Sequence, residues 1–219
     1  MNESRDMPDM PDMRDPPPMS PAPVVHWEQP ACQLPNGQMR AAFSLTLQPG
    51  LSVLLGGEGR GKSHTLNAIA GVAGSTSGGP GRTQGLLISL ESPADPSLDQ
   101  LTVLAHLAAR RACFVTWQAD VEAALVGAWA LAEHLHKPMF MLSTGSRRKV
   151  GLVAAAASGA PITLLDTPFA ALDARSSRIL CEVLAEAAQR RDRAWLLADY
   201  VLPSGLRGVP LMAVVNLGD

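Results

Sequence analysis

The stretch that most restricts the possible folds of this chain is GGEGRGKS, residues 56–63. It follows a short run of β-type residues, LSVLL at 51–55, and precedes KSHTLNAIAG, which reads as a helical segment. The stretch matches the pattern G-x-x-x-x-G-K-[ST], whose physical meaning depends on lying between a strand and a helix. We therefore predict an α/β fold in which this turn connects a strand to the start of a helix.

A turn of this kind binds phosphate groups, because glycines let backbone N–H groups approach the ligand closely. The helix that follows adds the positive end of its dipole. Lys62 would reach the outer phosphates, and the Ser63 hydroxyl would bind magnesium. The alternative is a flexible glycine turn that precedes Lys-Ser by chance. The residues predicted to bind the nucleotide here are Gly56, Gly57, Glu58, Gly59, Arg60, Gly61, Lys62, Ser63 and His64.

A second candidate site residue is Asp166, at the end of the apolar run ITLLD. A carboxylate at the end of a strand beside a phosphate loop is the usual partner of the magnesium ion. Taken alone, Asp166 could instead cap a turn or a helix. Together with Lys62 and Ser63, it predicts a site for ATP and Mg²⁺.

The rest of the chain alternates strands with helices. This alternation predicts a P-loop NTPase fold, with a mostly parallel sheet sandwiched by helices and a small antiparallel β subdomain within 25–48. Residues 1–24 repeat Met-Pro-Asp and are predicted to be a disordered tail, with a docking peptide as the alternative. Residues 25–219 would form one nucleotide-binding domain, with a helical insertion at about 95–145. The strands expected after the first are 86–91, 161–166 and 194–199, and residues 75–85 are expected to form a loop.

Helices are expected over 101–112, 121–136, 149–157 and 175–191. In the second of these, Val121, Leu125, Ala128, Ala132 and Leu135 recur every three or four residues and would share one face.

Composition and charge restrict the partners and the cellular location that we expect. The net charge of −2 gives no electrostatic reason to expect nucleic acid. The three cysteines lack metal-ligand spacing, and no apolar stretch follows a basic start, so we expect a protein of the reducing cytosol. The longest apolar region, 150–165, is too interrupted to span a bilayer.

Two further motifs give the chain a resemblance to a known family. LSTGSRRK at 142–149 resembles the signature of ATP-binding cassette (ABC) proteins, and AALD at 170–173 resembles their D-loop. With the phosphate loop and Asp166, the resemblance covers about residues 45–180. The chain looks most similar to the ATP-binding subunits of haem exporters used in cytochrome c maturation.

The resemblance implies two partners. Ser143 and Gly145 of the signature would contact the γ-phosphate of ATP held by a second ABC subunit, either a copy of this chain or a related one. Taken alone, the same residues are explained as a capped helix start. The other implied partner is an integral-membrane permease. The chain would be cytoplasmic, and binding to the permease would hold it at the inner face of the cell membrane.

The sequence departs from the family at catalytic positions. The glutamate that activates the attacking water is expected at 167, where Thr167 is far too weak a base. The switch histidine is expected near LLADY, where we place Asp199. The family's glutamine that helps to bind metal is expected around 91–92, where this chain has Glu91 and Ser92. Trp27 is the only nearby aromatic candidate for stacking on adenine. We expect nucleotide binding without efficient self-sufficient hydrolysis.

Two functions follow, and a third is disfavoured. The leading prediction is the ATP-binding subunit of an ABC-type transporter. The alternative is a non-hydrolysing regulatory or scaffolding subunit paired with an intact ATPase. A soluble P-loop phosphotransferase would leave the signature and the D-loop unexplained.

Overall fold

The computed structural model of the 219-residue chain describes residues 25–33, 37, 39–71, 80–83, 86–91 and 96–218. The tail predicted at 1–24 and Ser92 of the expected glutamine position lie outside these residues. So do 75–79 and 84–85 of the expected loop.

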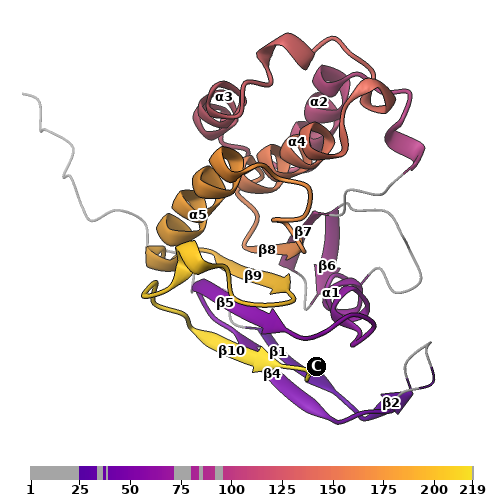
Figure 1. Cartoon of the computed structure of the whole chain (residues 1–219), viewed down its shortest axis with the longest axis vertical. Helices are drawn as coiled ribbons and strands as arrows, with labels where there is room; N and C mark the ends of the chain where they lie inside the picture. Colours follow the sequence, from indigo (N-terminus) through magenta and orange to yellow (C-terminus); the bar gives the residue numbers. More distant parts are fainter. Residues whose placement is uncertain are drawn as a thin grey trace, which may run out of the picture.

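Within the described residues, the central sheet has six strands in the order β10-β5-β9-β8-β7-β6 (Figure 1). Neighbouring strands run parallel, except that β6 is antiparallel to β7. The sheet is therefore mostly parallel, as predicted. The strands are β5 (Gly50–Leu55), β6 (Pro80–Thr83), β7 (Leu86–Glu91), β8 (Ile162–Asp166), β9 (Ala194–Asp199) and β10 (Ala213–Asn216).

In the part of the chain that the structure describes, two small antiparallel sheets accompany the central sheet. In the first, β1 (Val25–Gln29) pairs with β4 (Phe43–Leu47). In the second, β2 (Cys32–Gln33) pairs with β3 (Met39–Arg40). They form the antiparallel β subdomain predicted for this part of the chain.

The helices cover the sheet and fill the connection between β7 and β8. α1 contacts β8 and β9, whereas α4 contacts β7 and β8, and α5 contacts β5 and β9. α2 and α3 belong to the insertion between β7 and α4. The α-helices are α1 (Lys62–Ile69), α2 (Val103–Cys113), α3 (Ala119–Ala128), α4 (Thr144–Ala157) and α5 (Ala174–Gln189). Short 3₁₀ turns are η1 (Pro96–Leu98), η2 (Ala132–His134), η3 (Met139–Met141) and η4 (Ser204–Leu206).

The central strands bury side chains on both faces of the sheet. Successive residues of a strand point to opposite faces, and in β9 Trp195 and Leu197 join the core under α4 and α5. Leu196 and Ala198 join the second core, which includes residues of α1, β1 and β4. Figure 1 shows α4 and α5 on one side of the sheet and α1, β1 and β4 on the other. This double burial explains why the strands read as continuous apolar runs.

The helix predicted over 121–136 was wrong in its second half. α3 ends at Ala128, and Ala130 has a positive φ of 53°. The N–H of Leu131 donates to the carbonyl of Val126 at 2.9 Å, which closes the end of the helix. The turn buries Trp129, whose indole N–H donates to the carbonyl of Ser176 in α5 at 3.4 Å. Burial of this large ring against α5 outweighs the continued helical period.

The loop predicted over 75–85 was also partly wrong, because Pro80–Thr83 forms β6. Glycine and proline indicated a loop, yet β6 lies at the sheet edge and begins with Pro80, where the missing N–H is tolerated. The C-terminal strand β10 was not predicted. It becomes a strand by pairing in parallel with β5.

A close backbone approach fixes the end of α4. Gly159 has a φ of +62°, and a Cβ atom there would lie 2.0 Å from the Thr116 carbonyl oxygen. Gly159→Ala should therefore lower the free energy of unfolding by about 2–4 kcal/mol, through overpacking and backbone strain. The control is Gly127→Ala in α3, where a Cβ meets nothing within 4 Å. Urea denaturation of both variants checks this, and equal stability of the two would contradict it.

Among the described residues, no helix has both the length and the apolar character that crossing a bilayer requires.

Candidate nucleotide site

The carboxyl ends of the central strands bring the predicted site residues to one edge of the sheet. Leu55, the last residue of β5, pairs with Asp199 at the end of β9. On the other side of β9, Asp166 pairs with Ala198, and one strand further Glu91 pairs with Leu165. In parallel sheets, ligands bind outside this edge. Topology therefore joins segments that are distant in the sequence.

The loop after β5 provides an anion site in its geometry. Gly59 and Gly61 have φ values of 73° and 83°, a region that residues with a side chain rarely adopt. α1 then begins at Lys62 without a side-chain cap or an acidic residue in its first turn. Its first N–H groups have no intrahelical partner. The helix start thus offers donors and positive potential to a phosphate group.

Gly56 and Gly57 have a different role from Gly59 and Gly61 in the loop. Their N–H groups donate to the carbonyls of Asp199 and Gly218, at 3.3 and 2.9 Å. Their own carbonyls accept hydrogen bonds from the Lys62 ammonium, at 2.6 and 2.8 Å. These two glycines therefore position Lys62 and do not direct their N–H groups at a ligand.

A pocket of about 370 Å³ opens at this loop. Most of its lining was predicted from sequence, namely residues 58–64 and Asp166, together with Thr167 at the position expected for the catalytic glutamate. Tyr200 also lines it and was not predicted. The hydrophilic, cationic loop on one wall and the carboxylate on another suit a phosphate chain with a divalent cation.

Lys62 and Arg60 are cations that line the pocket, and the Lys62 side chain is largely buried, with 6% of the residue exposed. Burial lowers the pKa of Lys62, whereas the nearby Asp166, Asp199 and Glu58 carboxylates raise it. A ligand phosphate would add negative charge beside the ammonium and favour its charged form.

Ser63 and Asp166 could hold the magnesium ion. The Ser63 hydroxyl hydrogen-bonds to the Asp166 carboxylate, which shows that the two groups are adjacent. Burial raises the pKa of Asp166, while Ser63, Arg148 and Lys62 lower it. A carboxylate and a hydroxyl beside phosphate oxygens are ligands that Mg²⁺ accepts. When bound, the ion would neutralise charge on the phosphates.

Thr167 lies at the pocket in an unusual backbone conformation. Its φ is 43°, and its N–H donates to the Ala198 carbonyl of β9 at 2.8 Å. A β-branched residue at positive φ is strained, and such strain is typical of functional sites. Thr167 is therefore held at the wall of the pocket, but with a hydroxyl in place of a carboxylate.

The end of β9 directs Tyr200, and not Asp199, to the pocket wall. Asp199 is 9% exposed, and its Oδ1 accepts a hydrogen bond from the N–H of Tyr200 at 2.7 Å. Burial raises the pKa of Asp199, and the Tyr200 N–H opposes this. The equivalence of Asp199 to the switch histidine stays a prediction, and the structure adds Tyr200 as a second candidate for that place.

Glu91 at the end of β7 is buried beside Arg148 of α4. The two side chains approach to 3.6 Å, and Arg148 donates to the Asp166 carbonyl at 2.9 Å. Neither carboxylate oxygen of Glu91 has a hydrogen-bond partner among the described residues. Burial raises the pKa of Glu91 to about 7, although Arg148 acts to lower it. Sequence reasoning missed Arg148, because only the fold brings α4 to β7.

This burial predicts a pH-dependent cost in stability. The folded chain holds the Glu91 proton up to about pH 7, whereas the unfolded chain releases it near pH 4.5. Stability should therefore fall as pH rises between these values, by a total of about 3 kcal/mol. Glu91→Gln should remove the loss, so that its advantage over the wild type appears at pH 8 and vanishes at pH 4. Denaturant unfolding across this range measures it. The exposed control Glu182→Gln should show no such trend.

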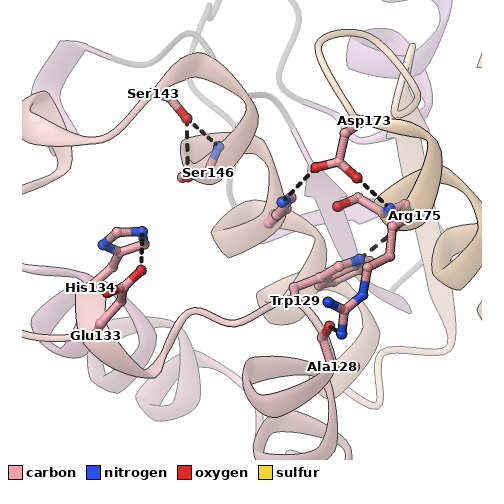
Figure 2. Close-up of polar contacts among 10 residues, drawn as sticks. Ala128, Trp129, Glu133, His134, Ser143, Ser146, Asp173 and Arg175 are labelled. Atoms are coloured by element: carbon pink, nitrogen blue, oxygen red, sulfur yellow. Dashed lines mark hydrogen bonds and ion pairs between the residues drawn. The ribbon is translucent and has the colours of Figure 1, made fainter.

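The signature residues lie at the start of α4. Ser143 caps this helix, with its hydroxyl accepting from the Ser146 N–H at 3.1 Å (Figure 2). A Cβ atom on Gly145 would lie 2.5 Å from the Ala171 carbonyl oxygen, so glycine is required there for packing. Neither residue lines the pocket around Lys62. Their predicted contact with ATP would therefore have to be made across an interface with another subunit, and it stays a prediction.

The D-loop segment is tied to α4 and α5. Asp173 caps α5 by accepting from the Ser176 N–H at 2.7 Å, and Lys149 approaches it to 3.3 Å. Hydrogen bonding with Ser176 is the main reason that the pKa of Asp173 is lowered to about 2. Figure 2 shows this aspartate at the start of α5, near Trp129. The signature helix and the D-loop thus form one connected unit.

Trp27 lies in β1 and is partly buried against the second core. This contact gives the ring a structural part, and its stacking on adenine stays a prediction.

The sequence around this site matches a known protein family. The sequence model of the ABC transporter family matches residues 41–170, which include the glycine-rich loop, the signature and Asp166. The chain belongs to the ABC transporter family. This assignment confirms the resemblance drawn from the sequence motifs.

Individual ABC relatives agree with this assignment. The chain is 30% identical over 187 residues to the cytochrome c biogenesis ATP-binding export protein CcmA of Novosphingobium aromaticivorans, covering 85% of this chain and 93% of that protein. It is 34% identical over 187 residues to the taurine import ATP-binding protein TauB of Pseudomonas aeruginosa, covering 78% and 70%.

Solved ABC structures confirm the predicted fold. One ATP-binding subunit of an ABC transporter superimposes with a TM-score of 0.64 at 21% identity, covering 82% of this chain and 81% of that one. An ABC transporter ATP-binding protein from Pyrococcus furiosus gives a TM-score of 0.62 at 18% identity, covering 88% and 98%. At these identities the likeness concerns the fold alone.

Proposed function

We propose that this chain binds Mg-ATP and couples that binding, with at most slow hydrolysis, to transport through a separate membrane permease. The observation that carries the proposal is the pocket in which Lys62, Ser63 and Asp166 meet at the start of α1. Membership of the ABC family supports the ATP-binding role. The relatives include an export protein and import proteins, so similarity supports either direction of transport.

The alternative is a subunit in which ATP stabilises assembly without turnover. Thr167 favours this function, because no carboxylate stands at the position expected for the general base. In both cases the partners would be a second ABC subunit and a permease, and the chain would lie at the cytoplasmic face of the membrane through that permease.

The test begins with binding. Calorimetric titration of the folded protein with Mg-ATP should give saturable heat, and sedimentation at equal protein concentration should show a dimer that Mg-ATP promotes. Absence of binding would contradict the proposed function. Binding without a dimer would agree with the proposed nucleotide site but contradict pairing with a second copy of this chain. The partner would then be sought among related ABC chains encoded beside a permease.

A further inference from the structure

Tyr200 covers the Lys62 ammonium at the candidate nucleotide pocket. The centroid of its ring lies 4.1 Å from the Lys62 ammonium nitrogen, within the range of a cation–π contact. The residue is half exposed, at 50%, and lines the same pocket as the phosphate loop. The contact joins the end of β9 to the first residue of α1.

The contact adds an aromatic face to the hydrogen bonds of the Lys62 ammonium. An ammonium group has three N–H donors. Two of its interactions are the hydrogen bonds to the Gly56 and Gly57 carbonyls, and the third is the aromatic face. A ligand phosphate that reaches Lys62 must therefore take the place of the ring or break a bond that holds the loop.

Distance favours replacement of the ring. A phosphate oxygen bonded to the ammonium lies about 2.8 Å from it, and the phosphorus lies one P–O bond further. The ring centroid lies at nearly the same distance from the ammonium nitrogen, 4.1 Å, and Tyr200 lines the same pocket that a phosphate would enter. Ring and terminal phosphate therefore compete for the same space in front of Lys62.

The attachment of Tyr200 lets the ring leave while its backbone stays. Its N–H is held by the buried Asp199 carboxylate at 2.7 Å, whereas the ring is half exposed and the next residue, Val201, is 70% exposed. Rotation about the side-chain bonds can thus carry the ring into solvent. A half-exposed cation–π contact corresponds to a factor of about 2–5 in binding. A charged hydrogen bond to phosphate corresponds to a factor of about 10–150, so phosphate displaces the ring.

We propose that Tyr200 is an aromatic lid on Lys62, which competes with the terminal phosphate of Mg-ATP and is displaced when that phosphate binds. The proposal rests on the proposed function of the site as a nucleotide site. It makes Tyr200 the residue that sets the affinity for ligands whose phosphates reach Lys62. A ligand without phosphate, such as adenosine, leaves the ring in place.

The sequence offers a direct probe, because Tyr200 is the single tyrosine of the chain. Incorporation of fluorotyrosine gives one ¹⁹F resonance, which Mg-ATP should shift and adenosine should not. In calorimetry, Tyr200→Ala should bind Mg-ATP about 2–5-fold more tightly than the wild type. Tyr200→Phe, which keeps the ring, should stay within about twofold of the wild type.

Each other outcome overturns the lid. If the wild type binds Mg-ATP while the ¹⁹F resonance stays unchanged, the lid is absent and the nucleotide site remains. If Tyr200→Ala binds more weakly, or Tyr200→Phe gains as much as Tyr200→Ala, the ring does not compete for Lys62. If the folded wild type binds no nucleotide at all, both the lid and the proposed function fail.

Discussion

Replacing Thr167 by glutamate should raise steady-state phosphate release by about 10²- to 10⁴-fold, the range by which a positioned general base accelerates proton transfer. Thr167 already lines the pocket with Asp166 and Lys62, so a carboxylate there would face the ligand. The backbone at this position has a positive φ of 43°, and glutamate is not β-branched, so the substitution should not add strain. Phosphate release under saturating Mg-ATP measures the gain.

The matched control is Thr167→Gln, because glutamine has the shape of glutamate but lacks its basic carboxylate. This variant should show no comparable gain. Addition of Asp199→His or Tyr200→His to Thr167→Glu separates the two candidates for the switch position at the end of β9. The variant with the correctly placed histidine should gain further. If Thr167→Glu alone and both double variants remain at the wild-type rate, position 167 is not where water is activated.

Lys62→Ala should weaken binding of Mg-ATP by about 10–150-fold, the factor that corresponds to loss of a hydrogen bond to a charged group. The ammonium is a cation that lines the pocket, and it also donates hydrogen bonds to the carbonyls of Gly56 and Gly57. The substitution therefore removes the ammonium that we propose to bind phosphate, and it loosens the loop that positions this group. Calorimetric titration with Mg-ATP measures the loss.

Lys137→Ala is the control for charge, because Lys137 lies in the helical insertion, beside His134, and does not line the pocket. Its affinity should equal that of the wild type. Thermal unfolding of both variants shows whether Lys62→Ala remains folded. Equal affinity of folded Lys62→Ala and wild type would mean that phosphate binds elsewhere.

Local signals explain why parts of the candidate site could be predicted from the sequence. The glycines at 59 and 61 adopt the positive φ values that a tight phosphate-binding turn needs, so the loop is encoded within a few residues. Ser143 and Asp173 likewise cap the helices that follow them. Caps and glycine turns depend on near neighbours in the chain, and for this reason they can be read without the fold.

Other features depend on contacts between distant segments. The period that predicted a helix over 121–136 was overridden, because Trp129 is buried against α5. Pro80–Thr83 became a strand only because β7 offers an edge to pair with. In both places the local pattern was correct about preference and wrong about outcome, since burial and pairing contribute more free energy than propensity.

By itself, the sequence determined the strand–loop–helix unit, the phosphate loop around Lys62 and the family of the chain, because these depend on short patterns with fixed spacing. Only the tertiary structure decided that Tyr200, and not Asp199, faces the pocket, and that Arg148 reaches Glu91 and the Asp166 carbonyl. Neighbouring residues at the end of a strand point to opposite sides, and the turn after β9 selects between them. That selection arises from packing across the sheet, which no local pattern contains.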